Sequence, residues 1–241
     1  MASSLLALVA AAALTAAFSA VAGMGGGIAL LGVMSLLLPA ADVVPMHGVV
    51  QLGSNFTRTV AFFRHADWRI VPRFGLGSAL GMGLATSLWA GGDLAWFKPA
   101  IGVFILCFLV YRRNKPKLRG LPMWSFLPVG FVAGGLGLLV GATGPFIAPF
   151  FLRDDLDKEA VVATKAACQT LGHIFKLPAF LWLGYDYLDR PWLWLALLGA
   201  VVLGTLLGKR VLGTLSRKQF ERLFEGVLAA IALGLIVRAL L

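Results

Sequence analysis

Residues 23–27 read Gly-Met-Gly-Gly-Gly and break a long apolar segment, 5–38, into two parts. A second apolar segment, 125–152, is broken in the same way by residues 141–145, which read Gly-Ala-Thr-Gly-Pro. The two stretches align without a gap when the chain is shifted by 118 positions. Glycine and proline interrupt helices, because they cost about 1 and about 3 kcal/mol in a helix interior. The sequence therefore predicts two related halves, each beginning with a broken apolar segment.

The rest of the chain is also strongly apolar. Apolar residues make up 59% of its 241 residues and charged residues 13%, whereas a soluble domain carries roughly 25% charged residues. Apolar runs close to the ~20 residues that cross a bilayer recur along the chain. We count six such runs, at 43–63, 70–90, 97–112, 159–183, 192–210 and 220–240. The predicted fold class is therefore an all-α polytopic membrane protein.

The basic residues predict how the two halves are oriented. Lys and Arg gather near 63–70, in the central loop and near 210–219, and they are sparse at 91–96 and 184–191. Positive residues mark the cytoplasmic side of a membrane protein. The run 43–63 then passes from outside to inside, and its counterpart in the second half passes from inside to outside. The two repeats are therefore predicted to be inverted.

This orientation also predicts the domain boundaries and the shape of the broken segments. The first repeat is expected at 1–112, a cytoplasmic linker at 113–124 and the second repeat at 125–241. The segment 125–152 has only 28 residues and must start and end inside. We therefore expect a re-entrant helical hairpin in each half, followed by three transmembrane helices, with a simple eight-span arrangement as the alternative.

Polar side chains line one face of the helix that follows each break. Spacings of 4, 4 and 3 residues separate the members of each set, and such spacings fall on one face of an α-helix. The first set is His47, Gln51, Asn55 and Arg58, and the second is Lys165, Gln169, His173 and Lys176. A basic side chain at the centre of a membrane helix costs about 2.5–3.5 kcal/mol, so such residues usually face a cavity, a partner or a substrate.

Breaks in matching positions of two inverted halves are typical of a transport site. Short helices are expected to restart at Ile28 and Phe146, and their first turns would offer free N–H groups to an anion. The predicted substrate-binding residues are Gly25, Gly26, Gly27, Gln51, Ser54, Asn55, Arg58, Thr143, Gly144, Lys165, Gln169, His173 and Lys176. The alternatives are that the glycines serve close packing, that the glutamines join helices, and that Arg58 and Lys176 extend to the membrane surface.

The charge pattern favours an anion as the substrate. Neither polar set contains Asp or Glu, whereas a cation site or a proton relay normally needs carboxylates within the membrane. Cys107 and Cys168 form no metal-binding spacing, and no nucleophile–base pair or cofactor motif is recognisable. We therefore predict no enzyme, no metal and no cofactor. We attribute the net charge of +10 to basic residues that set the membrane topology, and not to a surface that binds nucleic acid.

The same residues resemble a known family. Residues 23–27 resemble the first-repeat signature of the sulfite exporter TauE/SafE family, and residues 141–152 resemble the second. The run 163–169, with Gly172-His173 after it, is similar to one branch of that family. Residues 143–145 read Thr-Gly-Pro where many members repeat three glycines.

The resemblance implies a multi-pass permease of the prokaryotic plasma (inner) membrane, acting on small anions such as sulfite or organosulfonates, and a homodimer. The expected partners are thus a sulfur oxyanion, the lipid bilayer and a second copy. We expect a secondary transporter that exports its anion by alternating access. An anion channel through the same central site is the first alternative, and a non-transporting membrane subunit is a further one.

Overall fold

The computed structural model describes residues 2–22, 25–89, 122–151 and 158–211, together with short pieces elsewhere. The described residues form helices and connecting turns and contain no strand. The helices are α1 (Ala2–Ala22), α2 (Gly26–Leu37), α3 (Ala40–Ala61), η1 (Phe63–His65), α4 (Ile70–Trp89), η2 (Met123–Ser125), α6 (Phe126–Leu139), α7 (Gly144–Phe151), α8 (Lys158–Trp182) and α9 (Pro191–Val211). The expected crossings at 97–112 and 220–240 lie largely outside the described residues.

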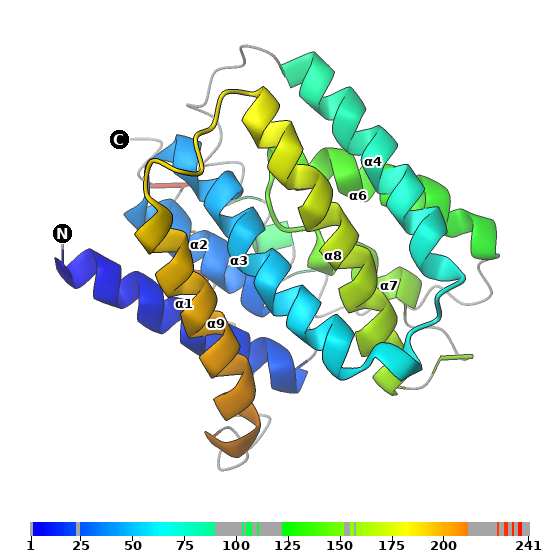
Figure 1. Ribbon diagram of the computed structural model, residues 1–241, viewed down its shortest axis with the longest axis horizontal. Helices are drawn as coiled ribbons and strands as arrows, with labels where there is room; N and C mark the ends of the chain where they lie inside the picture. Colours follow the sequence, from blue (N-terminus) through cyan, green and yellow to red (C-terminus); the bar gives the residue numbers. More distant parts are fainter. Residues whose placement is uncertain are drawn as a thin grey trace.

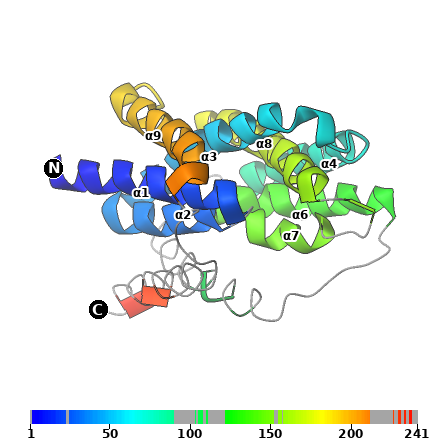
Figure 2. The same ribbon diagram turned by 90° about the horizontal axis from the view of Figure 1, so that it is seen from below.

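The helices are arranged in two layers. Figure 2 shows the long helices α3, α4, α8 and α9 in one layer, and the helix pairs α1–α2 and α6–α7 in the other. In Figure 1, α3 and α8 run side by side through the middle of the long-helix layer. They also pack against each other along their length. The two helices that carry the polar residues therefore lie at the centre of the molecule.

α3 and α8 run in opposite directions, and a polar contact at each end shows this. The backbone N–H of Asp67, just after α3, donates a hydrogen bond to Thr164 Oγ1 near the start of α8, at 2.9 Å. At the other end, Asp42 near the start of α3 pairs with Arg190, at the end of the connection from α8 to α9, at 2.8 Å. The loop at 63–70 thus lies on the same side as the start of α8.

Each pair α1–α2 and α6–α7 is a helical hairpin. The rings of Phe126, at the start of α6, and Phe151, at the end of α7, lie 5.2 Å apart between centroids. Phe151 also contacts Phe74 near the start of α4, at 6.3 Å. In the other hairpin, Gly26 at the start of α2 packs against the backbone of Thr15 in α1. The α6–α7 hairpin therefore begins and ends beside the start of α4.

Small residues bring the hairpins close to the long helices. A Cβ atom at Gly77 or Gly81 of α4 would overlap a backbone carbonyl of α6, and one at Gly130 of α6 would overlap the Phe74 carbonyl. A Cβ atom at Gly204 of α9 would likewise overlap the backbone of α1. Because glycine has no side chain, these contacts let the helix backbones approach closely. Glycine at these positions is therefore required by packing.

The helices of the second half repeat the order of those of the first. α7 and α8 each begin 118 residues after α2 and α3. α4 packs on α6 and α8, and α9 packs in the corresponding way on α1 and α3. The equivalent elements thus make equivalent contacts, and the halves pack on each other through α4–α6 and α1–α9 as well as through α3–α8.

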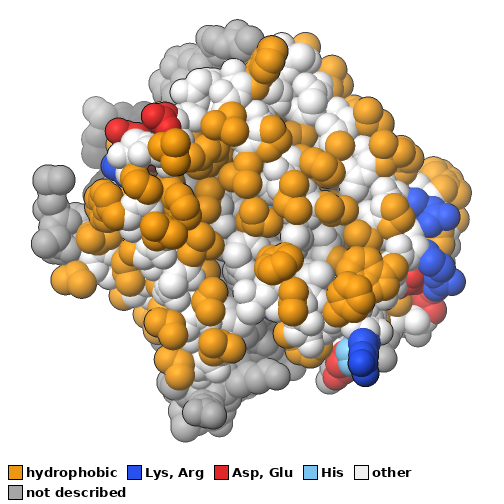
Figure 3. Space-filling model, viewed as in Figure 1, with side chains coloured by type: hydrophobic (Ala, Val, Ile, Leu, Met, Phe, Trp, Pro, Cys, Tyr) orange, Lys and Arg blue, Asp and Glu red, His pale blue; other side chains and the backbone are white. Residues whose placement is uncertain are grey.

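The surface over the long helices is largely apolar. Figure 3 shows apolar side chains covering the middle of this face, with Lys, Arg, Asp and Glu gathered at two opposite edges. Large exposed side chains on these helices include Phe56, Leu80 and Leu203. Contiguous exposed apolar surface on this scale is typical of a membrane or protein contact.

None of the helices within the described residues is both long enough and apolar enough to cross a membrane.

Candidate functional site

Both breaks are turns that only glycine adopts without strain. Gly25 has φ 99° and Gly141 has φ 89°, within the left-handed region that favours glycine. The short helices begin directly after these turns, α2 at Gly26 and α7 at Gly144. The expected starts at Ile28 and Phe146 were therefore wrong by two residues, because glycine also adopts helical backbone in a first turn.

The first polar set lies against the first break. His47 Nε2 is 2.8 Å from the carbonyl oxygen of Gly27. A Cβ atom at Gly27 would lie 3.2 Å from the amide group of Gln51, so the Gln51 side chain occupies the space that glycine leaves open. Both side chains are buried. α3 therefore contacts the first turn of α2 through two polar side chains.

The second polar set lies against the second break in a similar way. A Cβ atom at Gly144 would lie 3.1 Å from Gln169 Nε2, which makes Gln169 the counterpart of Gln51. Lys176 Nζ donates a hydrogen bond to the carbonyl oxygen of Gly141 at 2.8 Å, and this side chain is fully buried. Each break is thus held by one basic side chain from the long helix that follows it.

Arg58 is held in place by its own helix. Its Nη2 donates to Asn55 Oδ1 at 3.0 Å and to Ser54 Oγ at 3.3 Å. Its Nε donates to the Ser54 carbonyl oxygen at 3.3 Å. Arg58, Ser54 and Asn55 are all buried. Ser54 and Asn55 therefore fix the guanidinium group, and Arg58 does not extend to the membrane surface.

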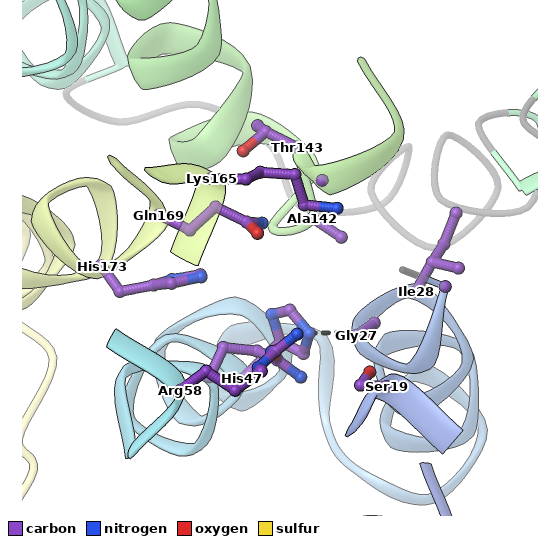
Figure 4. Close-up of a pocket in the computed structure, with 13 residues that line it drawn as sticks. Ser19, Gly27, Ile28, His47, Arg58, Ala142, Thr143, Lys165, Gln169 and His173 are labelled. Atoms are coloured by element: carbon purple, nitrogen blue, oxygen red, sulfur yellow. Dashed lines mark hydrogen bonds between the residues drawn. The ribbon is translucent and has the colours of Figure 1, made fainter. Parts of the chain in front are cut away.

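The two breaks and the two polar sets meet at one cavity of about 30 Å³ (Figure 4). Gln169 and His173 point into it from α8, and His47 and Arg58 lie opposite them on α3. The residues that line it are Ser19, Gly25, Gly27, Ile28, His47, Gln51, Arg58, Ala142, Thr143, Gly144, Lys165, Gln169 and His173. Residues from both halves therefore share one site.

Most of the predicted site residues line this cavity, and four do not. Those that line it are Gly25, Gly27, Gln51, Arg58, Thr143, Gly144, Lys165, Gln169 and His173. Gly26 packs against α1, and Ser54 and Asn55 hold Arg58. Lys176 lines an adjoining cavity that also borders Thr143, Gln169 and His173. These four residues lie next to the site without lining it.

Four lining residues were not among the predicted site residues. His47 belongs to the first polar set, and its spacing to Gln51 was sufficient to include it. Ile28 and Ala142 lie next to the breaks, and Ser19 lies in α1 beside Gly26. Ser19 lies on an apolar helix whose other faces pack against α2 and α9, so no periodic pattern distinguishes it.

The cavity is basic. Arg58 and Lys165 line it and are buried, and none of its lining residues is an acid. Buried Asp42 lies at the far end of α3, where it pairs with Arg190. A cavity that is lined by basic side chains and by no acid favours a bound anion. Within the described residues, no cluster of His, Cys, Asp and Glu is suited to hold a metal ion.

The comparisons with known proteins identify one family. A family model described as "Sulfite exporter TauE/SafE" matches residues 8–235 of the chain. No curated protein and no solved structure matched it. The matched range contains both breaks, both polar sets and every residue that lines the cavity.

Proposed function

The chain belongs to the sulfite exporter TauE/SafE family, and on this basis we propose that it exports a small sulfur oxyanion, sulfite or an organosulfonate, by alternating access. Membership makes it a membrane anion transporter. The observation that carries the proposal is the shared cavity, which joins both glycine breaks to Arg58 and Lys165 and has no acid in its lining. We place the protein in the prokaryotic plasma membrane, with the apolar face over the long helices toward lipid.

We further propose that the halves 1–112 and 125–241 are inverted repeats, each a re-entrant hairpin followed by three transmembrane helices. Three observations support this: the antiparallel course of α3 and α8, the matching contacts of α4 and α9, and the adjacent ends of the α6–α7 hairpin. Transporters of this kind bind their substrate where the repeats meet. The cavity lies between the repeats in this arrangement.

The substrate would be held by backbone and side chains together. The first turns of α2 and α7 leave N–H groups without a partner inside the helix, and these ends carry a partial positive charge. Arg58 offers a planar set of donors that suits an oxyanion, and Ser54 and Asn55 keep it in place. Gln51 lies beside Gly27 of the first break, and Gln169 lies beside Gly144 of the second. Each half thus contributes a helix end, an amide and a cation.

Movement of one hairpin or repeat against the other would open the cavity to each side in turn. An inside-negative membrane potential favours export of an anion by about 2.3 kcal/mol per charge for each ~100 mV. The potential alone therefore provides a driving force of the required sign.

The test uses purified protein in liposomes loaded with sulfite. We expect efflux above that of protein-free liposomes, and a loss of about tenfold or more in Arg58→Gln and Lys165→Gln, since each removes a charged donor worth about 1.5–3 kcal/mol. Arg64→Gln is the matched control, because Arg64 is exposed outside the cavity. If sulfite, organosulfonates, sulfate and thiosulfate all stay inside, the proposed substrate class is wrong. Fast flux without counter-transport of labelled sulfite would favour a channel.

A further inference from the structure

His47 has a defined tautomer when its ring is uncharged. Its Nε2 lies 2.8 Å from the Gly27 carbonyl oxygen, and a carbonyl oxygen only accepts hydrogen bonds. Nε2 must therefore carry the hydrogen. In the neutral ring the other nitrogen, Nδ1, is then an acceptor and cannot donate to an anion.

Nδ1 of His47 makes no hydrogen bond in the described structure, although the Gly141 carbonyl also interacts with this ring. The side chain is 1% exposed, and its Nδ1 is buried without a hydrogen bond. The same holds for Nδ1 of His173, whose side chain is 6% exposed. A buried polar atom without a partner costs about 1–3 kcal/mol. Both rings line the cavity, so a molecule bound there is in position to be the hydrogen-bond partner of these nitrogens.

The two rings face each other across the cavity from α3 and α8. Their centroids are 6.2 Å apart, and the rings are close to perpendicular. Among the described residues, His173 makes no contact like that of His47 with Gly27, so no carbonyl there fixes its tautomer and its Nδ1 is able to donate. One ring can accordingly accept a hydrogen bond from a ligand while the other donates one. This pair matches an oxyanion that carries one proton.

Within the described residues, the other charged groups that line the two cavities beside His47 are all basic. Arg58 lies on the same helix, and Lys165 and Lys176 lie on α8 with His173. The Lys176 side chain passes Gly48, next to His47, on its way to Gly141. α1, α2 and α7 contain no titratable side chain. No acid is therefore available in the cavity lining to pair with a protonated His47.

We propose that the site binds its oxyanion together with one proton, which lies between His47 Nδ1 and an oxygen of the anion. For sulfite, the bound species is hydrogensulfite on a neutral ring or sulfite on a protonated ring, and both contain the same number of protons. A fully deprotonated anion on a neutral ring would instead place an oxygen lone pair against the Nδ1 lone pair. This inference rests on the proposed function, since it specifies the protonation of that substrate.

The inference has a consequence for transport. Each anion leaves the cavity together with its proton, so sulfite leaves as hydrogensulfite, which has one negative charge. The membrane potential then acts on one negative charge and not on two. Export is correspondingly linked to the proton gradient as well as to the potential.

The test is calorimetric titration of the purified full-length protein with sulfite, under anaerobic conditions at a pH where free sulfite is a dianion. Titrations in Tris and in bicine, whose ionisation enthalpies differ, count the protons taken up on binding. We expect about one proton per bound anion, and a Kd that rises about tenfold for each pH unit, as linkage of one proton requires. Sulfite binding without proton uptake, and with a Kd that does not change with pH, would overturn the inference.

His47→Gln assigns the proton to this ring. The glutamine amide retains a donor for the Gly27 carbonyl oxygen and does not titrate, so we expect weaker binding with no proton uptake. His65→Gln is the matched control: His65 lies in η1, is exposed, and should leave the full uptake unchanged. Unchanged uptake in His47→Gln would overturn the assignment.

The remaining outcomes are also decisive. If His47→Gln does not fold, the change of the wild-type Kd with pH decides the inference by itself. If the wild-type protein binds none of sulfite, organosulfonates, sulfate and thiosulfate, the proposed function fails and the inference fails with it. Binding without proton uptake overturns the inference alone.

Discussion

The two glycine breaks have the same backbone form but different supports. Gly25 and Gly141 have nearly equal φ angles, and each precedes a short helix that faces the same cavity. The first break is held by an imidazole, at Gly27, and the second by an ammonium group, from Lys176. The first support lines the cavity, whereas the second lies behind it.

The breaks also differ in the donors that they offer. The first turn of α2 offers the N–H groups of Gly26, Gly27 and Ile28, whereas Pro145 in the first turn of α7 has none. The comparison shows how two related halves become unequal while the cavity between them is kept. The first half supplies more backbone donors and holds its break with the titratable ring of His47. The second half holds its break with Lys176, whose ammonium group is already hydrogen-bonded to Gly141.

The largest effect is expected at Gly26. A Cβ atom there would overlap the Thr15 backbone and Ser19 Oγ, which have no room to move within the hairpin. At Gly144, 118 residues later, a Cβ atom would meet only the end of the flexible Gln169 side chain. Gly26→Ala should therefore lower the free energy of unfolding by about 3 kcal/mol, and Gly144→Ala by less than about 1 kcal/mol. Thermal unfolding in one detergent compares the two, and equal losses would mean that the breaks are packed alike.

A smaller effect is expected from removing the support of the second break. Lys176→Met keeps most of the apolar stem but leaves the buried Gly141 carbonyl oxygen without its donor. The expected loss of stability is about 2 kcal/mol. The melting temperature of Lys176→Met measures it, with Lys176→Arg as a control that retains a donor. A melting temperature equal to that of the wild type would show that the second break needs no support.

The smallest effect measures the free-energy cost of the left-handed backbone conformation that both breaks share. Gly184 has φ 86°, close to Gly25 and Gly141, and a Cβ atom there would meet nothing within 4 Å. Gly184→Ala should therefore cost only the left-handed conformation, about 1 kcal/mol. Gly141→Ala should cost more, because its Cβ atom would lie 3.0 Å from Leu31 and 3.1 Å from Val44. Similar shifts in melting temperature for both variants would contradict this packing.

The sequence predicted the parts of the site whose residues recur at the spacing of an α-helix. Each polar set keeps one helix face, so the side chains that share a face with Gln51 and Gln169 could be placed from spacing alone. The 118-residue offset likewise predicted where α7 and α8 begin relative to α2 and α3. The helical fold was predicted from composition and the lengths of the apolar runs. These features are local, and local patterns are visible in a sequence.

The parts that were missed depend on tertiary contacts. Spacing alone does not indicate that Asn55 turns toward Arg58, or that Lys176 reaches a backbone carbonyl in the other layer. Ser19 and Ala142 have no distinctive neighbours in the sequence and line the cavity because the hairpins bring them there. The role of Gly26 in packing against α1 is also hidden, because the same residue type serves turns and close contacts.

The central claim is that both breaks and both polar sets form one anion site. A structure determined in the presence of sulfite tests it directly. We predict density for one anion within hydrogen-bond distance of the first turns of both α2 and α7, contacted by Arg58 and Lys165. An anion bound at one break only, or outside this cavity, would contradict the claim.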